Sequence, residues 1–155
     1  MKRRALAIEL KIAIVAVIAG TVAAFSFLAP AVGKAIVERY PELGYLYTPC
    51  LVFIWVTAVP LLWSFVQSWL IVSEVGKDNT YCLGNVKRFG VISKLILADV
   101  LLYTVALILT VAYGLFHPVM YLLLTILIFV GAIVSIVASA SSNYIARYRE
   151  RNNIK

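Results

Sequence analysis

The sequence is poor in charged residues and in the side chains that most metal sites require. Only 14% of its 155 residues are charged, whereas a soluble domain usually carries about 25%. It has one histidine, His117, and two cysteines, Cys50 and Cys82, which fit no C-x-x-C or metal-type spacing. One histidine without a cluster of acids or cysteines does not form a zinc site. We therefore expect no metal site and no cofactor.

Catalytic motifs are also missing. The sequence contains no G-x-S-x-G, no H-E-x-x-H and no phosphate-binding P-loop. These motifs place a nucleophile, a metal or a phosphate in a defined local structure, and nothing here offers a substitute. We expect that the protein is not an enzyme.

Long apolar runs are what the sequence has instead. Hydrophobic residues make up 63% of it, and four blocks each exceed about 18 mostly apolar residues, the length typical of a membrane span. Lipid offers the backbone no hydrogen-bond partners, so each block should be a helix. The sequence predicts an all-α integral membrane protein, a four-transmembrane-helix bundle in one membrane domain over residues 1–155. The blocks are approximately 12–32, 50–72, 91–113 and 119–142.

The net charge of +7 is distributed unevenly between the segments that flank these blocks. Twelve Lys and Arg residues fall on one side, and Lys34 and Arg39 fall on the other. By the positive-inside rule both termini are cytoplasmic, and the charge attracts anionic lipid headgroups. We expect no direct binding of nucleic acid, because no basic, aromatic domain is left to carry it. A cleaved signal peptide is the alternative for the first block, but Glu9 and Lys11 interrupt its start.

Two of the blocks carry rows of small residues at four-residue spacing. Such rows let helix backbones approach closely in lipid. Whether the two rows meet each other or a second protomer stays open, so a homo-oligomer is one alternative. The rows are Ala16, Gly20 and Ala24 in the first block, and Gly131, Ser135 and Ser139 in the fourth.

The segment 73–99 is the only sizeable polar interruption between blocks. Asp78-Asn79-Thr80 is typical of a helix start, which predicts a short interfacial helix before the third span. Its apolar side would include Phe89, while its polar side would face water and headgroups. The helix would be a membrane-lying connector or a docking segment for a soluble partner. The residues assigned to this cytoplasmic segment are Asn85, Lys87, Arg88 and Phe89.

Asp99 is the one acid that falls within an apolar block. A charge at mid-bilayer costs about 2.5–3.5 kcal/mol on insertion scales, so Asp99 should face protein or water. Counting from the predicted membrane boundaries places Gln67 at a similar depth, with Lys11 as a second candidate partner. We expect an intramembrane polar cluster that serves either as a structural clasp, which we favour, or as a proton- or cation-responsive site. Its members are Asp99, Gln67, Ser64 and Tyr103.

The second block carries a recognisable pattern. It contains Tyr47-Thr48-Pro49-Cys50-Leu51 and Ile54-Trp55-Val56-Thr57-Ala58-Val59-Pro60, followed by Gln67. This pattern resembles the YPCL…IWxTAxP…Q signature of the YoaS-like family of bacterial four-helix membrane proteins, known as domain of unknown function 2975. The family tends to have a Phe-Ser-x-x-Asn-like stretch in the second loop, where this chain departs with Tyr81-Cys82-Leu83-Gly84-Asn85.

The resemblance implies a small protein of the bacterial cell membrane, encoded beside a small helix-turn-helix transcriptional regulator. We therefore expect a non-enzymatic, regulatory protein whose cytoplasmic loop docks a partner. The alternative is a small proton- or cation-coupled transporter, or a transporter subunit, that uses Asp99. A purely structural or lipid-organising role is a third possibility.

Overall fold

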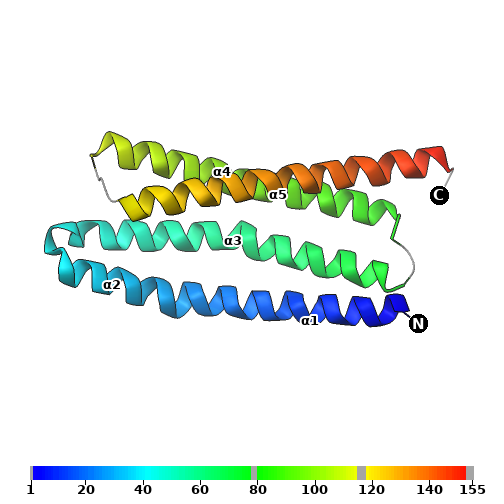
Figure 1. The fold of residues 1–155 in the computed structure, drawn as a ribbon, viewed down its shortest axis with the longest axis horizontal. Coiled ribbons are helices and arrows are strands. Elements are labelled where there is room, and N and C mark those ends of the chain that lie inside the picture. Colours follow the sequence, from blue (N-terminus) through cyan, green and yellow to red (C-terminus); the bar gives the residue numbers. More distant parts are fainter. Residues whose placement is uncertain (1, 78–79, 115–117, 153–155) are drawn as a thin grey trace.

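The computed structural model describes residues 2–77, 80–114 and 118–152. All regular structure in these ranges is helical, and the helices lie side by side as long rods (Figure 1). Four stretches are long and apolar enough to cross a membrane, which confirms the predicted number of spans. They are Ala7–Arg39, Gly44–Val75, Leu83–Ala112 and Met120–Arg151.

The first rod is one continuous helical run. It consists of α1 (Lys2–Ala23), a π-helical segment η1 (Ala24–Leu28) and α2 (Ala29–Arg39). Pro30 follows the π segment and has no N–H to donate, so the widened turn lies where α-helical hydrogen bonding is interrupted. The rod ends at Arg39 because Tyr40, which precedes Pro41, leaves the helical region at φ −134° and ψ 78°. Residues 31–39 therefore belong to the first rod.

The helix α3 (Gly44–Val75) is longer than the block 50–72 and continues through both Pro49 and Pro60. Membrane helices tolerate an interior proline because neighbouring groups satisfy the freed carbonyl. In the turn after Pro60, the Ser64 hydroxyl donates to the Pro60 carbonyl at 2.9 Å. A short 3-10 turn, η2 (Pro41–Leu43), joins the first rod to α3.

The helix α4 (Leu83–Ala112) corrects the prediction of a short interfacial helix before the third span. Cys82 is the residue that precedes it, and the helix is unbroken from Leu83 to Ala112. The stretch expected to lie on the membrane surface therefore forms the first turns of α4. Asp78 and Asn79, expected as the helix start, lie outside the described residues. The helix ends where Gly114 adopts φ 65°, a left-handed conformation that glycine takes without strain.

The four predicted spans pack as an open row, in which each helix contacts the next one along the chain. The first rod packs on α3, α3 packs on α4, and α4 packs on α5 (Pro118–Arg151). Within the described ranges, the backbone of the first rod approaches neither α4 nor α5. Both termini lie at one end of the row (Figure 1). We call this the basic end, because Lys11, Arg88 and Arg149 belong to the segments there, and we call the opposite end the far end.

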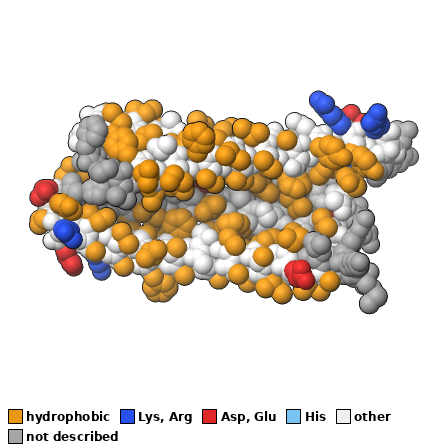
Figure 2. Space-filling view, viewed as in Figure 1, with side chains coloured by type: hydrophobic (Ala, Val, Ile, Leu, Met, Phe, Trp, Pro, Cys, Tyr) orange, Lys and Arg blue, Asp and Glu red, His pale blue; other side chains and the backbone are white. Residues whose placement is uncertain are grey.

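The distribution of side chains is that of a membrane protein. Hydrophobic side chains cover the middle of the visible face, whereas the charged ones gather toward the two ends (Figure 2). The interior is unusually polar. Nearly half of the buried residues are polar or charged, which is the arrangement expected when lipid surrounds the outside. The buried polar residues are Thr57, Ser64, Asn85, Asp99, Thr110 and Ser135.

Candidate functional site

The interface between α4 and α5 is the most extensive contact between helices in the described part of the chain. A Cβ built on Gly131 would lie 2.6 Å from Val100 Cγ2, so only glycine fits there. One turn along, the Ser93 hydroxyl donates to the Ser135 carbonyl at 2.9 Å, and the Ser135 hydroxyl donates to the Ser93 carbonyl at 3.0 Å. Ser142 adds a third bond, from its hydroxyl to the Val86 carbonyl at 2.9 Å. The predicted close packing of the small row in the fourth block is thus used within the chain.

The small row of α1 has no such partner. Ala16, Gly20 and Ala24 are exposed, and a Cβ built on Gly20 would meet no atom within 4 Å. The predicted alternative in which the two small rows meet each other is therefore wrong. Whether the α1 row meets a second protomer stays a prediction.

The first rod instead contacts α3 at the basic end through residues outside this row. The Lys11 ammonium lies over the Trp69 ring, 5.2 Å from its centroid, and Ala7 packs against Gly76. Lys11 is therefore engaged with α3 near the basic end, which argues against the expected pairing with Asp99.

Asp99 lies near the middle of α4 and is only 6% exposed. Its Oδ1 atom has no hydrogen-bond partner. One turn further along the same face, the Tyr103 hydroxyl lies close to the Thr57 side chain on α3. The Tyr103 ring also packs edge-on against Phe53, with centroids 6.1 Å apart. Asp99, Tyr103 and Thr57 thus share the α3–α4 interface.

Gln67 does not lie level with Asp99. The contacts of Tyr103 with Thr57 and of Arg88 with Leu70 fix the antiparallel register of α3 and α4. In this register Asp99 is level with residues 59–61 of α3, and Gln67 lies about six to eight residues further toward the basic end, about 9–12 Å along the axis at 1.5 Å per residue. The estimate of equal depth counted from the ends of the apolar blocks at residues 72 and 91, whereas α3 continues to Val75 and α4 begins at Leu83.

The remaining members of the predicted cluster differ in their roles. Ser64 is buried, but its hydroxyl is bonded within its own helix to Pro60. Thr57 belongs to the site, although we did not assign it from the sequence. The available signal was its place on the same face of the second block as Pro60 and Ser64.

The chemistry open to this site is limited by its single acid. A buried carboxylate oxygen without a partner is costly, and protonation or a bound cation would remove that cost. Within the described ranges, no three His, Cys, Asp or Glu side chains come together in a way that would hold a metal ion. The arrangement therefore suits a proton or a weakly held monovalent cation better than a transition metal.

At the basic end, the predicted polar side of the loop is turned inward. Asn85, expected to face water, is completely buried, and its amide donates to the Thr80 carbonyl at 3.0 Å. Arg88 is half-buried and donates to Asn85 Oδ1 at 3.1 Å and to the Leu70 carbonyl at 3.4 Å. Phe89 packs against the buried cluster of Ile71, Ile92 and Ala138. Of the four residues assigned to this segment, only Lys87 is exposed.

The connection before α4 is also attached to the end of α5. Tyr81 stacks on Tyr148 with ring centroids 4.4 Å apart, and Arg149 donates to the Tyr81 carbonyl at 3.4 Å. Sequence reasoning missed this contact, because residues 81 and 148 belong to segments that it treated as separate.

The two cysteines are free thiols near opposite ends of the row. His117 lies outside the described residues.

Comparison with known proteins gives a family but no function. No curated protein and no solved structure matches the chain. The sequence profile described as "Protein of unknown function (DUF2975)" matches residues 31–146, which include α3, α4 and most of α5. This match bears out the resemblance seen in the second block, and the chain belongs to the DUF2975 family.

Proposed function

We propose that the protein is a non-enzymatic, regulatory protein of the bacterial cell membrane that docks a soluble partner at its basic end. The proposal takes both termini to be cytoplasmic. The twelve Lys and Arg residues on one side against two on the other support this orientation.

The observation that carries the proposal is the length and charge of α5. It has 34 residues, about 51 Å at 1.5 Å per residue, whereas the hydrocarbon core is about 30 Å thick. Its last turns therefore project beyond the lipid, and Arg147, Glu150 and Arg151 are exposed there. The Tyr81–Tyr148 stack joins this end to the connection before α4, so the two segments form one surface.

The burial of Asn85, Arg88 and Phe89 moves the docking surface away from the loop segment that the sequence suggested. Charges exposed near this surface include Lys87 on α4 and those at the end of α5. Charges arranged around an interface act mainly on partner choice and association rate. The partner that the family resemblance implied, a small helix-turn-helix transcriptional regulator, remains the partner we propose.

A cross-linking pull-down from native membranes tests the docking proposal. We expect reversal of the exposed charges with Lys87→Glu, Arg147→Glu and Arg151→Glu to remove a soluble partner that the unmodified chain captures. The control reverses Lys34 and Arg39 at the far end, which changes charge without touching the basic end. An identical set of captured proteins for the charge-reversed and unmodified chains would exclude docking at this surface.

A second candidate function rests on the unpaired oxygen of Asp99. In this alternative the protein is a small proton- or cation-coupled transporter, or a subunit of one, and Asp99 carries the ion. We would then expect solute flux that depends on pH and disappears in Asp99→Asn, while the exposed acid variant Glu9→Gln keeps it. Equal flux in Asp99→Asn and the unmodified chain, at equal expression, would leave Asp99 as a structural clasp.

A further inference from the structure

A crevice of about 440 Å³ opens between α3, α4 and α5 near the basic end. Its walls are mostly apolar, with side chains from all three helices: Ile71, Val75, Phe89, Ala140, Tyr144 and Ile145. This volume falls within the range of about 300–1,000 Å³ typical of small-molecule sites. The crevice exists because the backbones of α3 and α5 stay apart on either side of α4.

One wall of the crevice is polar and connects it to a cation. Asn85 and Thr80 line it, and the buried Asn85 side chain accepts a hydrogen bond from Arg88 at 3.1 Å. No carboxylate within the described ranges lies at ion-pair distance from Arg88, and the two bonds it makes leave donors of its guanidinium unused. An arginine that lacks an ion-pair partner among the described residues, beside an apolar crevice, is complementary to an amphiphile with an anionic head.

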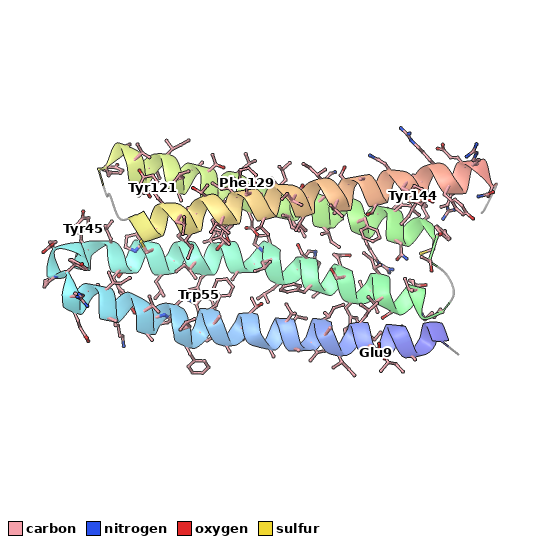
Figure 3. The ribbon with its side chains drawn as sticks, in the orientation of Figure 1. Glu9, Tyr45, Trp55, Tyr121, Phe129 and Tyr144 are labelled. Carbon is pink, nitrogen blue, oxygen red and sulfur yellow. The ribbon has the colours of Figure 1, made fainter. Side chains whose placement is uncertain are left out.

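The surroundings of the crevice fit the boundary between lipid and water. Tyr144, on α5 near the basic end (Figure 3), is 64% exposed, and tyrosine is enriched at the headgroup level of membrane proteins. Leu83 and Val137, on the neighbouring exposed surface, are 53% and 59% exposed. Such a surface faces acyl chains, so a soluble peptide would have to displace lipid to reach the crevice.

We propose that this crevice binds one acyl chain of an anionic glycerophospholipid, with Arg88 holding the phosphate. Arginine presents a planar set of donors that matches a phosphate group, and the apolar walls cover the chain. The lipid would contact α3, α4 and α5 together at the basic end. The site is separate from the exposed charges proposed for partner docking.

Native mass spectrometry of the purified full chain, with phosphatidylglycerol or phosphatidylcholine added, tests this proposal. We expect phosphatidylglycerol to be retained in preference to phosphatidylcholine. Arg88→Gln should reduce this preference on the order of tenfold or more, because the neutral side chain loses the charged hydrogen bonds to the phosphate. Lys94→Gln removes the same charge from an exposed position on the same helix and should keep the preference. Equal retention of the two lipids, or equal effects of the two variants, would overturn the proposal.

A second pair of variants tests the acyl-chain part. Ala140→Phe should fill the crevice and lower retention of both lipids, whereas Val137→Phe adds the same side chain one turn away on the exposed surface. A competition experiment on the unmodified protein tests the acyl-chain part even if Ala140→Phe fails to fold. Glycerol 3-phosphate, which has no chain, should not displace phosphatidylglycerol from the unmodified protein. Displacement by it, or unchanged retention in a folded Ala140→Phe, would contradict the proposal, as would a protein segment found in the crevice in place of lipid.

Discussion

The α4–α5 pair and the α1–α3 pair show two different ways for helices to meet in a membrane. The first pair combines a glycine contact with reciprocal serine hydrogen bonds along its length. The second meets through one cation–aromatic contact and the close approach of Ala7 to Gly76, both near the basic end. Both α1 and α5 carry rows of small residues, but only α5 uses its row within the chain.

The difference shows that small residues permit close packing without causing it. In lipid there is no hydrophobic force between helices, so their association relies on packing contacts and interhelical hydrogen bonds. The row in α5 contains Ser135, whose hydroxyl finds Ser93 on α4, whereas the row in α1 contains only Ala and Gly. The DUF2975 match begins at residue 31 and so leaves α1 outside it. The family match therefore includes α3 and α4 and most of α5 but not the helix with the unused small row.

The largest expected effect comes from substituting the glycine at the tight interface. Gly131→Leu should lower the free energy of unfolding in detergent by about 1–3 kcal/mol, because the new side chain overpacks against Val100, whose branched side chain has little rotamer freedom. Gly20→Leu, the matched change on α1, should stay within about 0.5 kcal/mol. Denaturant unfolding followed by circular dichroism measures both. Equal losses would show that the α1 row is covered, and a changed oligomeric state in Gly20→Leu would identify a second protomer as the cover.

The serine pair should contribute a smaller, measurable coupling. A double-mutant cycle of Ser93→Ala and Ser135→Ala should give an interaction free energy of about 0.6 kcal/mol, with about 1.7 kcal/mol as the upper bound seen for interhelical bonds in membranes. Ser141→Ala is the control, because its hydroxyl bonds within its own helix to the Val137 carbonyl at 2.8 Å. A coupling indistinguishable from zero would mean that the glycine contact alone holds the pair.

The smallest effect is expected at the contact that holds α1. Lys11→Met should weaken the association of α1 with α3 by about 0.5–1 kcal/mol, the value of an exposed cation–π contact. Disulfide formation between Ala7→Cys and Gly76→Cys, in a chain without Cys50 and Cys82, reports on this association. We expect the equilibrium constant for this disulfide, measured in a redox buffer, to be about two- to fivefold higher with Lys11 than with Lys11→Met. Lys94→Met, an exposed charge on α4, should leave it unchanged.

Much of the fold could be read from the chain, and the site could be read only in part. The four spans follow from block length, and the buried faces of α3 and α4 follow from Thr57, Ser64, Asp99 and Tyr103 recurring at helical spacing. The depth of Gln67 was misjudged because helices extend beyond their apolar blocks. A turn of helix that extends into the headgroup region can be polar, so the length of an apolar block does not reveal it.

The inward turn of Asn85 and Arg88 could not be predicted for a different reason. Polar residues at the start of a helix are usually placed toward water, and local sequence gives no reason to bury them. Their acceptors are the Thr80 carbonyl and the Leu70 carbonyl, and the second of these lies on another helix. Such partners become visible only once α3 and α4 are placed side by side.

The sequence by itself determined that this is a four-span, all-helical membrane protein with its positive charge gathered at one end, because lipid forces every apolar block of that length to satisfy its own backbone. Only the tertiary structure decided that the spans form an open row, that α5 alone uses its small residues, and that a crevice remains beside Arg88. Those outcomes depend on which side chains meet across helices. Contacts between segments that are far apart in the sequence produce no periodic pattern from which they could be predicted.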